Sequence, residues 1–323
     1  MRRLFALIAV ILICFLTPVS VFSLPVERAE QEPVAGEGAR EDRITRFLLL
    51  GCDQSTKRTD SIMLVTVNES TKKATILQIP RDTYAEFTDK DYKKLNGAMT
   101  RLGQKEFKRF LSDAMGVPID FFVVLKLDFF DDLVDAIGGV DVEIPQDMQY
   151  SDPAQDLEID LSRGYAHLNG KEAEHFVRYR SGYVNADLGR LDAQKLFLKA
   201  FAKQCKSLSI VSLFRITCLA LTGLQTDVGI TDAVRVVGVL RECSIEELEV
   251  QTLSGQAVQG KSGAWYYAVN EEGASRQVRE LLLPSTEKGE GVFDKNGAFD
   301  RESNPDFHKI YIAKEQELPL LLQ

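Results

Sequence analysis

The sequence lacks the residue patterns of several common functional sites. Its five cysteines, at positions 14, 52, 205, 218 and 243, form no CxxC pair, and its three histidines are widely dispersed. This spacing argues against a zinc site. No serine, cysteine and histidine constellation points to a covalent intermediate. Four cysteines outside the first segment could pair, but most are better interpreted as small buried hydrophobic residues.

An excess of positive charge is also absent. The 323 residues include 39 lysines and arginines against 48 aspartates and glutamates, for a net charge of −9. No global basic field is therefore available to hold a nucleic acid. A phosphate ligand would need a local cluster of arginines, so the position of each arginine matters more than the total. The chain also has no internal repeat and no low-complexity tract.

The first 24 residues form the clearest non-globular segment. Arg2 and Arg3 precede an apolar run that ends near Leu24. At about 1.5 Å per residue, such a run can span the roughly 30 Å of a bilayer core. We interpret 1–24 as a transmembrane signal-anchor, and a signal peptide cleaved near Ser23 is the alternative. Either interpretation places the rest of the chain outside the cytoplasm.

The remaining chain divides by composition into three parts. Residues 25–43 are rich in Glu, Gly, Ala and Pro and predict a linker. Residues 44–283 alternate strand-like with helix-like patterns, and 284–323 are polar and irregular, as in a tail. Strands are expected at 46–50, 61–68, 73–79, 121–127, 140–144 and 249–253. Helices are expected at 129–137, 171–176 (capped by Asn169), 187–206, 216–224, 233–240 and 275–283. This interleaving predicts an α/β sandwich.

Charged residues gather at three places in this domain. The groups are Asp53 with Arg58 and Asp60; Arg81 with Asp82; and Arg178, Arg180, Asp187, Arg190 and Gln194. The first two groups follow predicted strands, where α/β proteins usually place ligands. Guanidinium groups bind phosphate oxygens bidentately, and carboxylates can hold magnesium beside phosphate. Taken singly, each group has an ordinary explanation as a turn, a surface ion pair or a solvated helix end.

Seven segments run in an order that resembles the LytR-CpsA-Psr family. They are RFLLLGCD, RTDS, LQIPRDTY, KKLNGA, GVPIDFFVVLKLDFFDDLVDAIGGVDVEIP, GYAHLNGKEAEHFVRYR and DLGRLDAQ. The resemblance covers about 44–206 and continues more weakly to about 283. It implies an α-β-α fold with a mixed central β-sheet, and a single-pass membrane protein whose domain lies at a Gram-positive-type cell surface.

Members of that family move a cell-wall glycopolymer from an undecaprenyl pyrophosphate carrier to peptidoglycan. Wall teichoic acid and capsular polysaccharide are among these polymers. The resemblance therefore implies a phosphotransferase with magnesium as cofactor. Its partners would be a polyprenyl pyrophosphate-linked glycopolymer, the peptidoglycan acceptor and the membrane, without nucleic acid. Two alternatives stay open: a polyprenyl-pyrophosphate hydrolase, and a non-catalytic envelope regulator that binds prenyl lipids.

The resemblance also implies roles for individual residues. Asp53 and Asp60 match the two aspartates associated with magnesium. The residues matching the pyrophosphate-binding positions are Arg58, Arg81, Arg178, Arg180, Arg190 and Gln194. We expect Arg81, Asp187 and Arg190 to be catalytic, with Asp187 or Asp60 accepting the proton of the attacking hydroxyl. The family usually has an arginine where this chain has Ala193, which predicts a weaker hold on phosphate.

Overall fold

The computed structural model describes residues 43–52, 58–85, 93–153, 157–183, 186–208, 216, 224–260, 263–283 and 312–313. The predicted membrane segment, the linker as far as residue 42 and most of the predicted tail lie outside these ranges. Among the helices that are described, none is both long enough and apolar enough to span a membrane.

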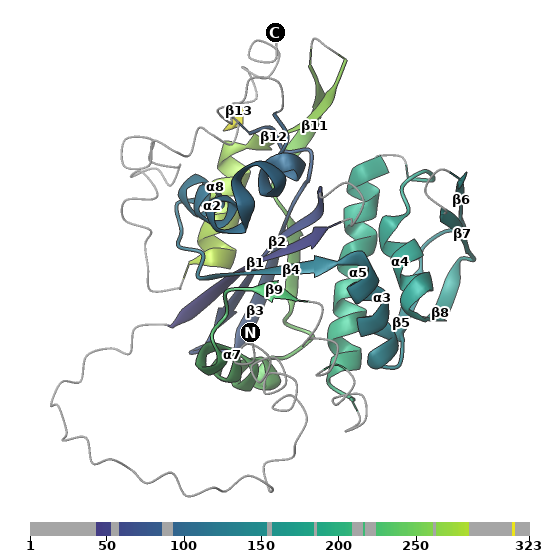
Figure 1. Ribbon diagram of the computed structural model, residues 1–323, viewed down its shortest axis with the longest axis horizontal. Helices are drawn as coiled ribbons and strands as arrows, with labels where there is room; N and C mark the ends of the chain where they lie inside the picture. Colours follow the sequence, from purple (N-terminus) through teal and green to yellow (C-terminus); the bar gives the residue numbers. More distant parts are fainter. Residues whose placement is uncertain are drawn as a thin grey trace, which may run out of the picture.

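A six-stranded sheet lies at the centre of the molecule (Figure 1). In spatial order its strands are β10 (Glu249–Thr252), β3 (Lys73–Ile79), β2 (Thr59–Asn68), β1 (Ile44–Cys52), β4 (Phe121–Lys126) and β9 (Gln225–Thr226). The pairs β10–β3 and β1–β4 are parallel, and the other three are antiparallel. The prediction of a mixed central sheet is therefore confirmed.

Alternation along β1 assigns the two faces of the sheet. Leu48 and Leu50 are fully buried in the main hydrophobic core. Leu49 and Gly51 alternate with them along the strand and therefore lie on the opposite face. There they line a cavity. Because successive strand residues face opposite sides, a slip of one residue in register would exchange core and cavity residues.

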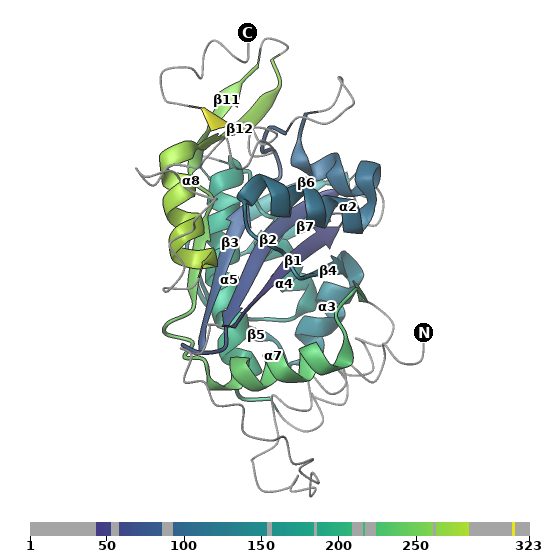
Figure 2. The same ribbon diagram turned by 90° about the vertical axis from the view of Figure 1, so that its left-hand side faces the viewer.

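Helical elements cover the Leu48 face of the sheet (Figure 2). They are η1 (Leu95–Gly97), α2 (Ala98–Met115), α8 (Glu271–Gln277) and the π-helical turn η3 (Val278–Leu282). Phe107 and Leu111 of α2 and Leu282 of η3 are fully buried against the strands. At about 25 cal/mol per Å² of apolar surface removed from water, this packing is the main stabilising contribution on this face.

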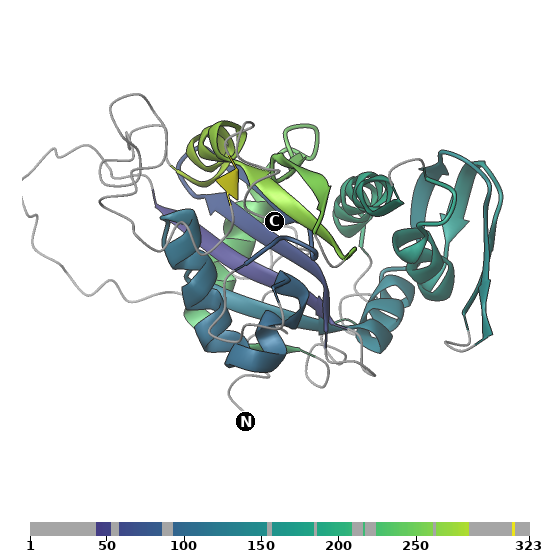
Figure 3. The ribbon, with the colours of Figure 1, turned by 90° about the horizontal axis from the view of Figure 1, so that it is seen from above.

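The other face carries α7 (Ile230–Glu242) and a side lobe that includes α5 (Ala186–Cys205), as Figures 1 and 3 show. The rest of the lobe is α3 (Leu127–Ala136), α4 (Gly170–Arg178) and two antiparallel strand pairs. The pairs are β5 (Val140–Ile144) with β8 (Gly164–Leu168), and β6 (Met148–Asp152) with β7 (Leu157–Leu161).

A close approach of two backbones sets the geometry of α3 and α4. A Cβ atom on Gly170 would lie 2.2 Å from the carbonyl oxygen of Asp131, so only glycine fits at the start of α4. The predicted cap is confirmed: the Asn169 side chain accepts from the Glu172 amide, and the Glu172 carboxylate accepts from the Asn169 amide. The cap fixes where α4 begins, and therefore which of its residues face the sheet.

Several elements have no counterpart among the predicted ones. They are α2 with η1, the strand pair β6–β7, strand β8, and the hairpin of β11 (Gly255–Gln259) with β12 (Trp265–Asn270). The strand β13 (Ile312–Ala313), from the predicted tail, pairs in parallel with β12. Of the helix predicted at 216–224, Ile216 is helical and Leu224 is not, and the residues between them lie outside the described ranges.

Candidate functional site

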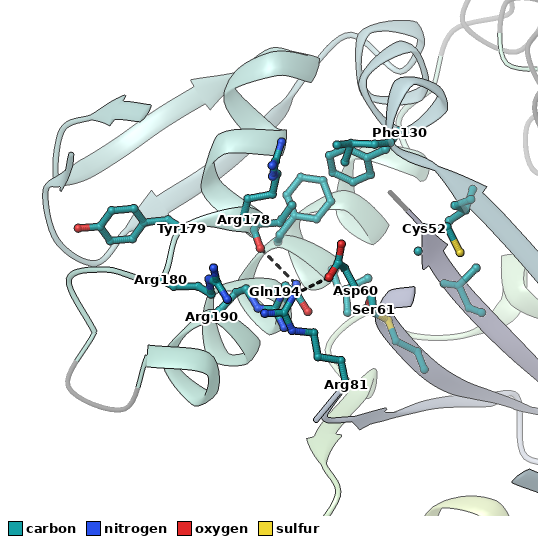
Figure 4. A pocket seen from close by; sticks show the side chains of 18 of the residues that line it. Cys52, Asp60, Ser61, Arg81, Phe130, Arg178, Tyr179, Arg180, Arg190 and Gln194 are labelled. Atoms are coloured by element: carbon teal, nitrogen blue, oxygen red, sulfur yellow. Dashed lines mark hydrogen bonds and ion pairs between the residues drawn. The ribbon is translucent and has the colours of Figure 1, made fainter. Parts of the chain in front are cut away.

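A cavity of about 680 Å³ opens between one end of the central sheet and the side lobe. β1, β3 and β4 end at the edge of the sheet where β2 begins. The cavity lies at this edge, and the four strands contribute Cys52, Asp60, Arg81 and Lys126 to its lining. The end of α4 and the first half of α5 form the opposite wall. Figure 4 shows these side chains around the cavity. We call it the arginine cavity.

Charge in the arginine cavity is opposite in sign to that of the whole chain. Its described lining contains five cationic side chains and two carboxylates. The cationic residues are Arg81, Lys126, Arg178, Arg180 and Arg190, and the carboxylates are Asp60 and Asp82. The chain as a whole carries a net charge of −9. A local excess of guanidinium groups beside apolar walls favours a phosphate-bearing, partly apolar ligand.

Arg81 and Asp60 bring two of the predicted groups together. The Arg81 guanidinium donates to the Asp60 carboxylate in an ion pair across the end of the sheet, and Figure 4 shows this contact beside Gln194 and Arg190. The Asp60 side chain is 42% exposed, whereas that of Arg81 is 18% exposed. Asp60 is therefore open to a ligand, and Arg81 is already oriented toward the cavity.

Arg190 and Gln194 follow one another by four residues on the cavity side of α5. Arg190 is 4% exposed, so its charge is largely removed from water. Gln194 accepts from the Gln78 Nε2 at 3.4 Å and donates to the Val177 carbonyl at 3.2 Å. These contacts tie α5 to β3 and to α4, so Gln194 braces the wall that presents Arg190.

Arg178 and Arg180 flank the end of α4. Tyr179 between them is buried in the lobe core, and both arginines line the cavity. Arg178 Nη1 donates to Glu174 Oε1 at 2.5 Å, one helical turn earlier. Glu174 is 2% exposed and also accepts from Lys171 Nζ at 2.6 Å. A buried carboxylate therefore holds Arg178 in place from behind the cavity wall.

Glu174 is also hydrogen-bonded to Asp131 of α3, and the two carboxyls differ in protonation. The pKa of Asp131 is raised to about 7, first by burial and then by the hydrogen bond and negative charge of Glu174. Burial raises the pKa of Glu174 as well, but the hydrogen bonds from Lys171 and Arg178 outweigh it and lower the pKa overall. Asp131 thus keeps its proton up to about pH 7, while Glu174 is ionised and holds Arg178.

Asp131 is expected to make stability fall as pH rises toward neutrality. Its folded-state pKa is above that of the unfolded chain, about 4. Its contribution is therefore complete at low pH and is lost by about pH 7. Asp131→Asn should flatten this slope. Its free energy of unfolding, compared with that of the parent, should rise by roughly 1–3 kcal/mol between about pH 5 and pH 8. Denaturant unfolding across this range measures it. The exposed neighbour Asp132→Asn is the control and should follow the parent, and parallel curves for Asp131→Asn would contradict the assignment.

A second, apolar cavity of about 420 Å³ lies on the same face of the sheet. Leu49, Leu125 and Leu198 line both cavities, so the two adjoin. Its walls come from β1, β2, β3, β4, α3, α5 and the α7 region and include Val65, Phe129 and Phe201. Cys205, another wall residue, has its pKa raised to about 12 by burial, so its thiol stays protonated. We call this the apolar cavity.

Ala193 faces away from the arginine cavity. It is buried in the lobe core with Ala173 and Phe176 of α4 and Phe197 of α5. The described lining of the cavity contains Arg190, Gln194 and Phe197 from this helix, and Ala193 is not among the lining residues. The alanine therefore fills a packed position, and the expected gap in the phosphate-binding surface does not follow from it.

The other predicted site residues lie elsewhere or are not described. Arg58 is exposed just before β2 and is not part of the cavity lining. Asp53 lies outside the described residues, and for Asp187 only the backbone, within α5, is described. Cys52 lines the cavity, and Cys205 and Cys243 are free thiols.

Magnesium is the cofactor implied by the sequence resemblance. Within the described residues, no group of three or more histidine, cysteine, aspartate or glutamate side chains could enclose a metal ion. Magnesium often needs only one or two carboxylates when substrate phosphates complete its shell. The half-exposed Asp60 carboxylate, beside four arginines that suit phosphate, fits that arrangement. Its role as a ligand stays a prediction.

Sequence reasoning missed three residues of this region. Glu174 could have been found from its spacing of four residues before Arg178 on one helix. Trp265 of β12 and Tyr150 of β6 line the cavity from hairpins that were not predicted. Nothing in the local pattern of either residue relates it to the arginines, because the relation depends on how the hairpins pack.

Comparison with known proteins agrees with this fold. The model of the LytR_cpsA_psr family matches residues 23–282. A polyisoprenyl-teichoic acid–peptidoglycan teichoic acid transferase, TagV of Bacillus subtilis (strain 168), is 29% identical over 243 residues, covering 72% of this chain and 62% of TagV. The crystal structure of B. subtilis TagV gives a TM-score of 0.63 at 25% identity, covering 76% of this chain and 100% of that chain. TagT bound to LIIa-WTA gives 0.61 at 26% identity, covering 80% and 98%.

These matches place the protein in a class of α/β proteins built on a mixed central sheet with helices. The chain belongs to the LytR_cpsA_psr family. The match with TagV spans less than two thirds of that relative's length, at 62%.

Proposed function

We propose that the protein is an extracytoplasmic phosphotransferase that attaches a glycopolymer, carried on polyprenyl pyrophosphate, to peptidoglycan. The observation that carries this proposal is the junction of the two cavities. Four arginines surround one cavity, and the cavity shares Leu49, Leu125 and Leu198 with an apolar one. A ligand with a pyrophosphate head and a prenyl tail matches both cavities, because the head suits the arginines and the tail suits the apolar walls.

The names of the relatives support the same substrate class. TagV is named for transfer of polyisoprenyl-linked teichoic acid to peptidoglycan, and one solved structure is of TagT bound to LIIa-WTA. We extend this to the present chain as a wall teichoic acid or a similar anionic glycan on an undecaprenyl carrier. A predicted N-terminal membrane anchor would keep the domain at the surface where carrier and peptidoglycan meet.

The proposed reaction is an attack by an acceptor hydroxyl on the phosphorus bonded to the glycan. A new oxygen–phosphorus bond forms, the bond to the bridging oxygen breaks, and polyprenyl phosphate leaves. Arg81, Arg178 and Arg190 stabilise the negative charge that develops on the phosphate oxygens. Magnesium, when bound, supplies further neutralisation of that charge. The hydroxyl proton passes to a carboxylate, for which Asp60 on the cavity wall and Asp187 are the candidates.

Product analysis tests the proposal. Full-length protein is incubated with a polyprenyl pyrophosphate-linked glycan, with and without peptidoglycan. We expect one polyprenyl phosphate released for each glycan joined to peptidoglycan, and little release without the acceptor. Release of phosphorylated glycan at the same rate with or without acceptor would instead identify a hydrolase. Lipid binding with no turnover under either condition would identify a binding protein, and either result would overturn the transferase.

A further inference from the structure

Two exposed aromatic side chains stand at the arginine cavity. Among the described residues, the large hydrophobic side chains that are exposed are Tyr150, Tyr165, Leu196 and Trp265. Tyr150 is 38% exposed and Trp265 is 57% exposed, and both line this cavity although they are 115 positions apart. Single exposed apolar residues are common, but two large aromatics from separate hairpins at one cavity indicate a binding surface.

The hairpin holds Trp265 in a defined direction. Along β12, Tyr266 points to one side, where its ring packs at 5.5 Å against the Tyr84 ring. Trp265 and Tyr267 point to the other side, as strand alternation requires. Tyr267 is buried and its hydroxyl donates to the Leu253 carbonyl at 2.7 Å. These two contacts fix β12 to the body of the protein next to Trp265.

The two aromatics occupy the outer part of the cavity. Arg190 is 4% exposed and lies deep, while Arg180 and Ser181 are exposed near the rim with Trp265. In the proposed complex the prenyl tail leaves the deep arginines toward the apolar cavity. The group on the other side of the pyrophosphate must then leave toward the exposed rim.

Sugar rings suit the chemistry of this rim. A pyranose ring has one face of C–H groups and an edge of hydroxyls. The electron-rich face of an indole or phenol ring attracts polarised C–H groups, and neighbouring polar side chains can bond the hydroxyls. Arg180, Ser181 and Asp82 supply such donors and acceptors beside the aromatics.

We propose that Trp265 and Tyr150 form a sugar-binding rim that stacks on pyranose rings of the glycan being transferred. The proposal rests on the proposed function, because it takes the position of the pyrophosphate from it. The same ring chemistry occurs in the donor glycan and in the peptidoglycan acceptor. The experiment therefore uses a separate probe for each source.

Trp265 is the single tryptophan of the chain, so its fluorescence reports on this rim alone. Full-length protein in detergent is titrated with geranylgeranyl diphosphate, with the same lipid diphosphate carrying N-acetylglucosamine, and with a lipid-free muropeptide. We expect the sugar-bearing lipid to change the tryptophan emission and the sugar-free lipid to leave it nearly unchanged. A change with the muropeptide alone would assign the rim to the acceptor sugar. No change with any sugar-bearing probe would overturn the proposal.

Substitutions extend the test with calorimetry as a second readout. Trp265→Ala and Tyr150→Ala should each weaken binding of the sugar-bearing probe by about five- to tenfold. Binding of geranylgeranyl diphosphate should stay within about twofold of the parent. Trp265→Tyr, which keeps a flat ring, should recover part of the loss. Tyr165→Ala is the matched control, because Tyr165 is 73% exposed and lies outside the cavity lining.

The outcomes separate this inference from the proposed function. Equal losses for both lipid probes in Trp265→Ala would indicate a structural role and overturn the sugar rim. Unchanged affinity for the sugar-bearing probe would overturn it as well. If the parent protein binds neither lipid diphosphate, the proposed function itself fails. If it binds both equally and loses both in Arg190→Ala, the proposed function stands and the sugar rim falls.

Discussion

Arg190→Ala is expected to lower the rate of glycopolymer transfer by about 10³-fold, because an arginine that stabilises a phosphoryl transition state is worth that much or more. Arg190 is 4% exposed and faces the arginine cavity, so its charge acts where water screens it little. Arg81→Ala should have a similar effect, since it also releases Asp60 from its ion pair. The transfer rate of Arg190→Lys should lie between those of the parent and Arg190→Ala, because lysine keeps the charge but lacks the planar guanidinium that binds two oxygens at once.

The assay measures linkage of labelled glycan to peptidoglycan by purified full-length variants. Circular dichroism and thermal unfolding of each variant show whether it is folded, which matters because Arg190 is buried. Arg109→Ala is the matched control: Arg109 lies on α2 with its side chain 72% exposed, far from the cavity lining, and its removal should leave transfer unchanged. Near-normal transfer by either folded variant, Arg190→Ala or Arg81→Ala, would remove that arginine from the proposed phosphate-binding site.

Removal of divalent cations is expected to slow transfer by at least about 10²-fold, and added magnesium should restore it. Two adjacent phosphates bring several negative charges into a cavity whose described arginines are partly engaged with carboxylates. A magnesium ion held by Asp60 would neutralise part of that charge. Asp60→Asn should therefore raise the magnesium concentration needed for half-maximal rate.

Asp192→Asn is the control for that series. Asp192 lies on α5 with its side chain 71% exposed, and it pairs with Lys195 at 2.9 Å. Its variant should need the same magnesium concentration as the parent. Transfer that is indifferent to EDTA would withdraw the metal role from Asp60 and from Asp53. A shifted magnesium requirement in both variants would point to a general charge effect instead of a ligand.

Much of the fold could be predicted because its signals are local. β1 and β4 contain short continuous apolar runs, and β2 and β3 are rich in β-branched and apolar residues on either side of a turn, so the approximate strand positions follow from the local pattern. The cap at Asn169 likewise depends on residues three positions apart. The helix α2 was missed for a physical reason. Its sequence is interrupted at Gly103, which has φ 77° and ψ 167°, and its apolar positions are few.

The resemblance implied that the phosphate-binding arginines belong to one site, but the packing that brings them together could not be predicted. Arg81 and Arg190 are 109 positions apart and meet only because β3 and α5 border one cavity. The ion pair of Glu174 with Arg178 could have been predicted from their spacing on one helix. The contact of Asp131 with Glu174 could not, because it depends on the close approach of α3 and α4, which Gly170 permits.

The sequence by itself determined which family the chain resembles, which residues carry the charge, and roughly where the main strands lie. These properties depend on residue type and on neighbours within a few positions. Only the tertiary structure decided that Ala193 faces the lobe core, that the arginine cavity adjoins an apolar one, and that Trp265 and Tyr150 reach the same rim. Those relations join residues far apart in the chain, and they are set by strand order and by the packing of the side lobe on the sheet.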